Sequence, residues 1–404
     1  MKRLIFTVLT LSLLLITSCN HKPVGVEPDN TNRSAVFSSE AIAMPEEWTV
    51  TNFPKLTYDG SSLSVDVYRE IDADNDGNGW PDIEETSAYF SADGAFLSVG
   101  NNDITDTSAA AFDARHDGRI VNTCSLNSGE TLVYETLYTD YEVGCYVHLY
   151  DEKDAYITTF YPADAFGYEL HRDVNSLSGD VFTVTTMLSV PGVGENVPAR
   201  YGILTTEGFA VYDASGSLSF KLDDGSTPSA VLDTDAGLLY LSENRQGVQS
   251  LRQIDTAIGR LDKDITLPEE LTAQTVESSS TKLISGDGYD LYAYNGRGLY
   301  GVDFVDAEFH TQSTLVIDWS LSNIAPSDIR ALCMIDDQTA AIATKDAMDN
   351  TADTVLSMCR MIPADQVVPK TEIVLAKLTD DWTLQYAVRD FNRTSETHRI
   401  VIRD

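Results

Sequence analysis

The residues with the most definite chemistry in this 404-residue chain form one acidic loop near its N-terminal end. Counted from Asp74, the loop places a carboxylate or amide oxygen at the first, third, fifth, ninth and twelfth positions, and Gly79 at the sixth. This twelve-residue spacing wraps alternate oxygen ligands around one calcium ion, with a carbonyl from the seventh residue. The sequence therefore predicts a structural calcium site within residues 72–85, with the ligands Asp74, Asp76, Asn78, Trp80, Asp82 and Glu85.

A solvated acidic turn is the alternative for this loop. Starting the count at Asp72 would place Ile83 at the twelfth position and lose the last carboxylate, so we expect the Asp74 register. The flanking residues favour strands over helices. Extracellular calcium modules have a Kd of about 10⁻⁴ to 10⁻³ M. At tenfold excess calcium, such a site stabilises the fold by about 1.4 kcal/mol.

Cys19 is the second chemically distinct residue. Lys2 and Arg3 precede an apolar run at residues 4–17, which is typical of a signal peptide and short for a membrane span. The tetrad ITSC that ends at Cys19 resembles a bacterial lipobox, in which the cysteine is diacylated and becomes the new N-terminus. The sequence thus predicts a signal peptide at 1–18, a lipidated flexible tether at 19–44, and anchoring of Cys19 on the extracellular face of the bacterial cell membrane. An ordinary signal peptide with a bystander cysteine is the alternative.

The other cysteines and the histidines do not form a recognisable reactive site in the sequence. The cysteines are widely spaced, so a metal site is not expected, and two disulfides or free thiols both remain open. These cysteines are Cys124, Cys145, Cys333 and Cys359. The six histidines are scattered, and the chain has no G-x-S-x-G elbow, phosphate loop or dinucleotide fingerprint. We therefore expect a protein that is not an enzyme.

The charge of the chain restricts its partners. Lys and Arg number 27 against 63 Asp and Glu, which gives a formal net charge of −36. Nucleic acid and anionic lipid headgroups both require clusters of basic residues, so neither is expected as an electrostatic partner. With 43% hydrophobic residues, the chain has enough apolar side chains for a folded core.

Short apolar runs dominate residues 45–370 and predict an all-β fold. Hairpin-like segments such as FAVYDASGSLSF (209–220) and LRQIDTAIGRLD (251–262) combine two runs with a polar turn. Such turns recur with a noisy period of roughly forty residues, the size of one β-propeller blade. The landmarks are Asp72, Asp113, Asp151, Asp213, Asp255, Asp303 and Pro363. They predict a propeller of about seven blades, with six or eight as alternatives.

The last residues follow a different pattern. Glu372–Leu378 forms an apolar strand, and Leu384, Ala387, Val388 and Phe391 share one helical face. Arg399–Arg403 is a further apolar strand. This order predicts a short β-α-β stub at 371–404, the truncated start of an α/β domain.

These final residues resemble the start of the extracellular solute-binding proteins of ABC importers. In that family the first strand leads into a helix that ends in a Phe-Asn turn, matched here by Phe391-Asn392. Residues 200–404 also resemble the propeller-like N-terminal region of lipid-anchored members. The matching segments are YGILTTEGFAVYDASGSLSFKL, LVIDWSLSNIAPSDIRAL and MIPADQVVPKTEIVLAKL.

The resemblance implies a non-catalytic lipoprotein for carbohydrate uptake, with an ABC permease and a glycan or protein ligand as partners. It also implies that Trp382 contacts a ligand, although packing at the helix start would equally explain this residue. A surface adhesion or scaffold propeller and a secreted propeller hydrolase or lyase are the alternative functions.

Overall fold

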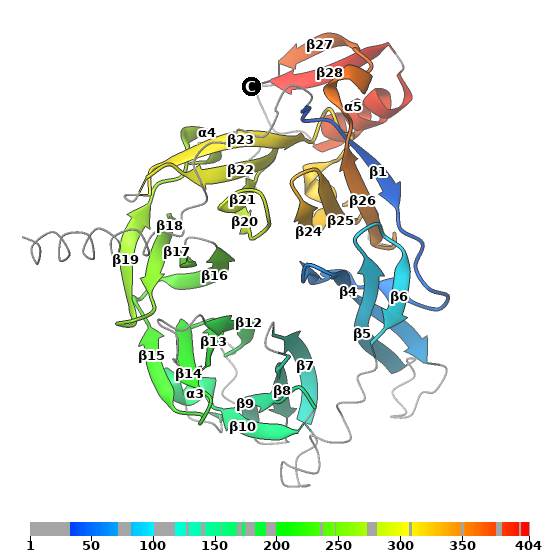
Figure 1. Cartoon of the computed structure of the whole chain (residues 1–404). Helices are drawn as coiled ribbons and strands as arrows, with labels where there is room; N and C mark the ends of the chain where they lie inside the picture. Colours follow the sequence, from blue (N-terminus) through cyan, green and yellow to red (C-terminus); the bar gives the residue numbers. More distant parts are fainter. Residues whose placement is uncertain are drawn as a thin grey trace, which may run out of the picture.

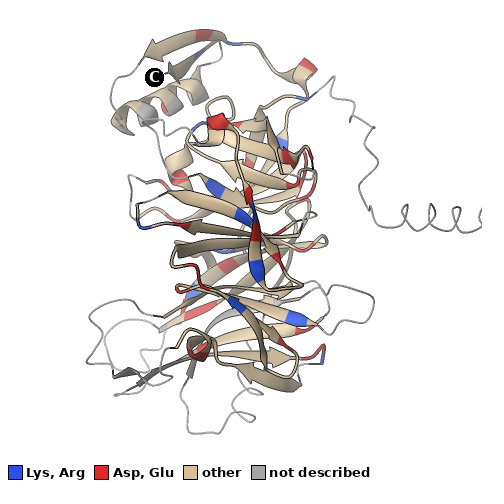
Figure 2. Ribbon diagram, turned by 90° about the vertical axis from the view of Figure 1, so that its left-hand side faces the viewer, with Lys and Arg blue, Asp and Glu red and all other residues tan. Residues whose placement is uncertain are grey.

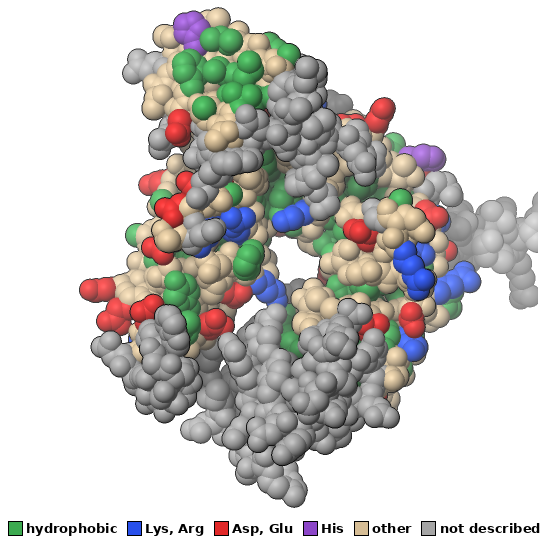
Figure 3. Space-filling view, turned by 180° about the vertical axis from the view of Figure 1, so that it is seen from behind, with side chains coloured by type: hydrophobic (Ala, Val, Ile, Leu, Met, Phe, Trp, Pro, Cys, Tyr) green, Lys and Arg blue, Asp and Glu red, His purple; other side chains and the backbone are tan. Residues whose placement is uncertain are grey.

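Antiparallel sheets arranged in a ring form the body of the computed structural model (Figure 1). The structure describes residues 33–71, 82–100, 118–126, 129–138, 142–153, 155–167, 172–173, 182–190, 199–234, 237–246, 248–272, 281–306, 309–347, 349, 351–376, 382–395 and 397–403. Six of the described sheets have four or five strands, and each is one blade of a β-propeller. The ring surrounds a central opening (Figure 3).

Each blade is an antiparallel meander that starts near the centre of the ring and ends at its rim (Figure 1). Blade 1 has β2 (Thr49–Val50), β3 (Leu56–Tyr58), β4 (Ser62–Ile71), β5 (Asp82–Ser91) and β6 (Phe96–Val99). Blade 2 has β7 (Gly118–Ser125), β8 (Thr131–Tyr138), β9 (Glu142–Tyr150), β10 (Tyr156–Phe160) and β11 (Arg172–Asp173). Blade 3 has β12 (Val184–Val190), β13 (Arg200–Thr205), β14 (Phe209–Asp213) and β15 (Leu218–Leu222).

The remaining three blades follow the same order. Blade 4 has β16 (Thr227–Thr234), β17 (Gly237–Glu243), β18 (Gln249–Asp255) and β19 (Arg260–Ile265). Blade 5 has β20 (Lys282–Ile284), β21 (Leu291–Tyr294), β22 (Gly298–Phe304) and β23 (Thr311–Asp318). Blade 6 has β24 (Ile329–Asp336), β25 (Thr339–Thr344), β26 (Val355–Met361) and β1 (Phe37–Ala41). The connections contain the short helices α3 (Pro162–Ala165), α4 (Glu269–Thr272), η3 (Pro326–Asp328) and η4 (Ala364–Gln366).

The described blades number six, one fewer than the seven predicted from the landmarks. Asp151, Asp213 and Asp255 each begin the turn from the third to the fourth strand of a blade, where their carboxylates accept backbone N–H groups. Asp303 and Pro363 lie in or just after the third strands of blades 5 and 6. Asp72 and Asp113 lie outside the described residues, and in the sequence they follow β4 and β6 of blade 1. Two landmarks were therefore counted around one blade.

An N-terminal strand closes the ring. β1 pairs antiparallel with β26, with Phe37 opposite Met361 and Ala41 opposite Ser357. Blade 6 therefore combines three strands from the end of the propeller with one strand that precedes blade 1. The flexible tether was predicted to extend over residues 19–44, and this C-terminal boundary is wrong. Residues 37–41 form a strand of the ring, in which Phe37 is only 2% exposed.

A small unit follows blade 6, in which β27 (Thr371–Ala376), α5 (Trp382–Thr394) and β28 (His398–Arg403) form a β-α-β arrangement. The two strands pair in parallel, and the Asn392 side chain hydrogen-bonds both backbone groups of Ile400. Val388 is buried at the predicted helix face, whereas Ile373 and Val374 in β27 are 45% and 57% exposed. Hydrophobic side chains accordingly gather on this unit (Figure 3). Its membership of a larger α/β domain stays a prediction.

The four cysteines after Cys19 are free thiols: Cys124, Cys145, Cys333 and Cys359. Burial raises the pKa of Cys333 to about 12 and that of Cys359 to about 11. Both thiols are therefore neutral and unreactive at ordinary pH. Among the described helices, none has the length and apolar character needed to cross a membrane.

Candidate functional site

The predicted calcium loop connects β4 and β5 and lies only partly within the described residues. Asp74, Asp76, Asn78 and Trp80 lie outside them. Asp82 and Glu85 belong to β5, where their backbones pair with Ile71 and Tyr68 of β4. The expected strand flanks are thus present. The described residues contain no group of three or more metal-binding side chains, and calcium binding stays a prediction.

The other two predicted site residues are Cys19 and Trp382. Cys19 lies outside the described residues, so its lipidation stays a prediction. Trp382 is the first residue of α5, in the C-terminal unit.

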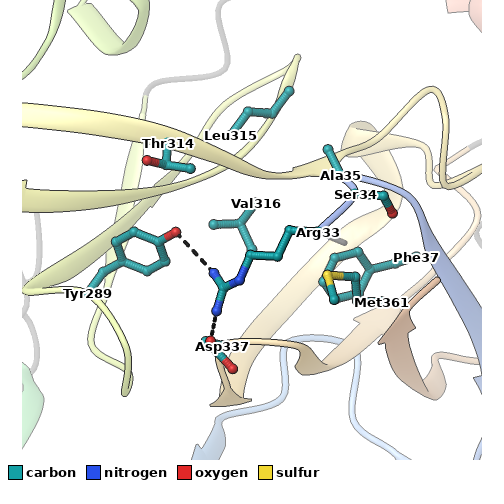
Figure 4. A pocket seen from close by; sticks show the side chains of 10 residues that line it. All are labelled: Arg33, Ser34, Ala35, Phe37, Tyr289, Thr314, Leu315, Val316, Asp337 and Met361. Carbon is teal, nitrogen blue, oxygen red and sulfur yellow. Dashed lines mark hydrogen bonds and ion pairs between the residues drawn. The ribbon is translucent and has the colours of Figure 1, made fainter. Parts of the chain in front are cut away.

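A pocket of about 270 Å³ lies between blades 5 and 6, and none of the sequence-predicted site residues lines it (Figure 4). Its polar side carries Arg33, Tyr289 and Asp337, which come from the N-terminal segment and from the turns before β21 and β25. Its remaining wall is largely apolar. The other lining residues are Ser34, Ala35, Phe37, Thr314, Leu315, Val316 and Met361.

The N-terminal arm, which we define as residues 33–36, brings Arg33 into the pocket. The arm is hydrogen-bonded to both blades, since Asp318 N–H donates to the Ala35 carbonyl and Ile362 N–H to the Val36 carbonyl, each at 2.8 Å. At the start of β1, Phe37 N–H donates to Ser322 Oγ at 3.0 Å. The arm is therefore fixed on the ring before β1 begins.

Tyr289 is positioned by two close backbone approaches. Its ring lies against Gly301 of β22, where an added Cβ would come within 2.3 Å of the ring carbons. It also packs edge-on against Tyr292, with 5.4 Å between ring centroids. Gly288 has φ +101°, a conformation that L side chains rarely adopt, and a Cβ there would meet Asp337 at 2.9 Å. These glycines let the turn before β21 reach both its own blade and blade 6.

Arg33 and Asp337 form an ion pair across the pocket, and Arg33 Nη1 lies 3.5 Å from Tyr289 Oη (Figure 4). The side chains of Arg33 and Asp337 are 24% and 35% exposed, so both are accessible to a ligand. The pair places hydrogen-bond donors and acceptors side by side with no net charge. The pocket therefore suits a ligand that has both polar groups and an apolar surface.

A second polar cluster, on β8, β9 and β10 of blade 2, was not predicted from the sequence. His148 Nδ1 lies 2.8 Å from Thr159 Oγ1, and His148 Nε2 lies 2.8 Å from Glu135 Oε2. Tyr156 Oη also contacts Thr159 Oγ1, at 2.9 Å. A hydroxyl, an imidazole and a carboxylate in this order could activate a nucleophile. However, His148 is 2% and Thr159 6% exposed, so we interpret the cluster as a buried network that joins three strands.

The acidic residues do not define a further site. Asp and Glu occur on strands and turns throughout the described part of the ring, with the fewer Lys and Arg scattered among them (Figure 2).

The solved structures that are similar to this chain are distant from it. The sequence matches no family profile and no curated protein. A protein of unknown function from Dyadobacter fermentans is similar in structure, with 9% identity, a TM-score of 0.46, and 80% of this chain and 98% of that chain covered. The WD40 domain of SCAP from fission yeast has 9% identity and a TM-score of 0.37 over 80% of this chain and 65% of its own. A glycosyl hydrolase from Bacteroides ovatus has 12% identity and a TM-score of 0.31, with 78% of this chain and 87% of that chain covered. The likenesses are too distant to indicate an activity.

Proposed function

We propose that the chain is a non-catalytic, lipid-anchored surface protein that forms the propeller part of an ABC-importer solute-binding protein for carbohydrates. In this proposal Cys19 carries the lipid and calcium rigidifies the loop at 72–85. The C-terminal unit connects the propeller to the binding and transport machinery.

The observation that carries the proposal is that the chain enters and leaves the ring at one place. The Ile362 N–H donates to the Val36 carbonyl at 2.8 Å, so the N-terminal arm and the exit toward β27 lie side by side on blade 6. Residues 19–33 span at most roughly 50 Å when fully extended. An anchor on Cys19 would therefore hold the C-terminal unit close to the membrane, where a permease is found.

The charge of the propeller supports the same orientation. A net charge of −36 opposes adsorption of the ring on an anionic leaflet. The ring would stand away from the lipid, and the membrane-proximal contact would be left to the C-terminal unit. The exposed Ile373 and Val374 give that unit an apolar surface suited to a protein partner.

Two measurements test the proposal. Mass spectrometry of the mature protein should find a diacylglyceryl group on Cys19, and an unmodified terminus or retained residues 1–18 would refute lipidation. A photo-crosslinking residue at Ile373 in intact cells should capture an integral membrane protein of an importer. The matched control is Leu218 in blade 3, which is 44% exposed against 45% for Ile373, and it should not capture that protein. Equal capture from both positions, or none from Ile373, would contradict the importer role.

A further inference from the structure

We propose that the pocket between blades 5 and 6 binds a single neutral sugar ring, either a free monosaccharide or one residue of a glycan. The inference rests on the proposed role in carbohydrate uptake and assigns a ligand class to a site on the propeller itself. It does not depend on lipidation of Cys19 or on the C-terminal unit.

The dimensions of the pocket favour a small ligand. Its volume of about 270 Å³ lies just below the range of roughly 300–1,000 Å³ found for pockets that hold drug-sized molecules. One sugar ring fits such a space, whereas a longer saccharide would have to extend out of its mouth.

The polar side of the pocket has the donors and acceptors that sugar hydroxyls require. Each hydroxyl both donates and accepts, and neighbouring hydroxyls on a ring present alternating groups. The Arg33 guanidinium has five N–H donors, and the Asp337 carboxylate has two acceptor oxygens. The ion pair of these residues uses only part of this capacity. Thr314, which is exposed on β23, adds a hydroxyl to the lining of the pocket.

Charge discriminates between ligand classes here. A phosphate or a carboxylate would need the full positive charge of Arg33, but Asp337 already neutralises it. The remaining charge of the chain is strongly negative and repels anions further. A cation would meet the Arg33 guanidinium. A neutral polyhydroxyl compound avoids both the repulsion of anions by the acidic chain and the repulsion of cations by Arg33.

The apolar side complements the C–H face of a sugar ring. Val316 is 7% exposed and Phe37 2%, which makes them a fixed floor, and Met361 lies beside Phe37 (Figure 4). The Tyr289 ring, braced by Gly301 and Tyr292, stands at the polar edge. A sugar ring has one apolar face and hydroxyl groups around its rim, so it matches a pocket with an apolar floor and a polar edge.

Saturation-transfer NMR and titration calorimetry on the soluble chain from residue 20 onward test the proposal. The probes are glucose, galactose, mannose and N-acetylglucosamine, with glucuronate and inorganic phosphate as anionic comparisons. We expect at least one neutral sugar to bind with millimolar affinity, as a small ligand with few contacts should. Its binding should also slow amide exchange in the N-terminal arm, because Arg33 belongs to it.

Variants assign the binding to this pocket. Asp337→Asn should weaken binding about tenfold by removing the charged acceptor, and Thr314→Val should weaken it less while preserving side-chain size. Asp262→Asn on the outer strand of blade 4 is the matched control and should bind as wild type. Lack of binding by all four neutral sugars, preference for glucuronate or phosphate, or wild-type binding in both pocket variants would overturn the proposal. None of these outcomes bears on Cys19 lipidation or on crosslinking from Ile373, so the two proposals can fail separately.

Discussion

The two faces of blade 1 differ sharply, although the same strands form both. Leu63, Val65 and Val67 of β4 and Ala88 and Phe90 of β5 are 0% exposed and join the apolar residues of blade 6 in one cluster. The residues between them point the other way and are polar or phenolic. They are Ser62, Ser64, Asp66, Tyr68, Ser87, Tyr89 and Ser91.

The difference continues around the ring. Five apolar clusters of described residues join consecutive blades, from blades 2 and 3 round to blades 6 and 1. None of these clusters joins blades 1 and 2. On the face of blade 1 opposite to blade 6, the Lys55 N–H donates to Asp66 Oδ2 at 2.8 Å, and burial raises the pKa of Asp66. Within the described residues, apolar clusters therefore stabilise five of the six joints between blades, whereas the Lys55–Asp66 contact lies within blade 1 itself.

The largest expected effect tests this contrast directly. Phe90→Ala should lower the free energy of unfolding by about 3–5 kcal/mol, because it removes a fully buried aromatic ring from the joint with blade 6. Tyr89→Ala is the control on the adjacent residue and the opposite face, and it should cost about 1 kcal/mol. Chemical denaturation measures both variants. Equal losses would remove the distinction between the two faces.

The buried network of blade 2 should have a smaller effect. Glu135→Ala leaves His148 Nε2 without its 2.8 Å partner and should cost about 1–3 kcal/mol. Glu135→Gln keeps a hydrogen-bonding group and should restore part of the loss. The exposed Glu152→Ala, in the turn after β9, should have little effect on the denaturation midpoint. A neutral outcome for Glu135→Ala would argue against the structural interpretation of the cluster.

Calcium would strengthen blade 1 independently of either joint. Millimolar calcium should stabilise the wild type by about 1.4 kcal/mol at tenfold excess over Kd, and Glu85→Ala should abolish the shift in Tm. Glu84→Ala is the matched control, since Glu84 is the neighbouring carboxylate and bonds Arg69 Nε at 2.6 Å instead. Identical melting of the wild type in calcium and in chelator would reduce the loop to an acidic turn.

Alkaline pH should weaken the apolar joint between blades 6 and 1. Burial raises the pKa of Cys333 from 9.0 to about 12, so the unfolded chain releases this proton first. The stabilisation from the neutral thiol is complete below pH 9 and is lost as the pH rises toward 12. By pH 10 the loss is about 1 kcal/mol. Cys333→Ala should flatten the dependence of stability on pH between 9 and 11, and an unchanged slope would count against burial as the cause.

The smallest effect concerns the C-terminal unit. Deletion of residues 371–404 should leave the unfolding midpoint of the propeller nearly unchanged, because the buried clusters of the ring contain none of its residues. Hydrogen exchange in the intact chain should be faster in β27, which among the described strands pairs on one edge only, than in β25. A large drop in the unfolding midpoint after the deletion would show that the C-terminal unit packs against the propeller and stabilises it.

The repeating strands could be predicted from the sequence because each strand pairs with a neighbour that is close in the chain. The segments at 209–220 and 251–262 form the hairpins β14–β15 and β18–β19, and the run at 291–294 is the fully buried β21. The alternating face of β4 and the parallel pairing of β27 with β28 also follow from short-range patterns.

The pocket could not be predicted in the same way. Arg33 meets Asp337 only because β1 returns to the last blade, and the polar segment around Arg33 gives no sign of this pairing. The one available signal was the apolar run of residues 35–37, which is too short to identify a strand. The cluster of Glu135, His148 and Thr159 likewise depends on the registers of three strands.

The position of β1 also sets the order of events while the chain is being synthesised. Ser38 Oγ bonds the carbonyl of Arg360, across a sequence separation of 322 residues. Blade 6 therefore remains incomplete until nearly the whole propeller has left the ribosome, whereas β1 is among the first segments to emerge. During that interval both β1 and the edge of β26 are unpaired strands, open to other chains. The pairing of β1 with β26 that closes the finished ring thus delays its completion and leaves the newly made chain open to aggregation.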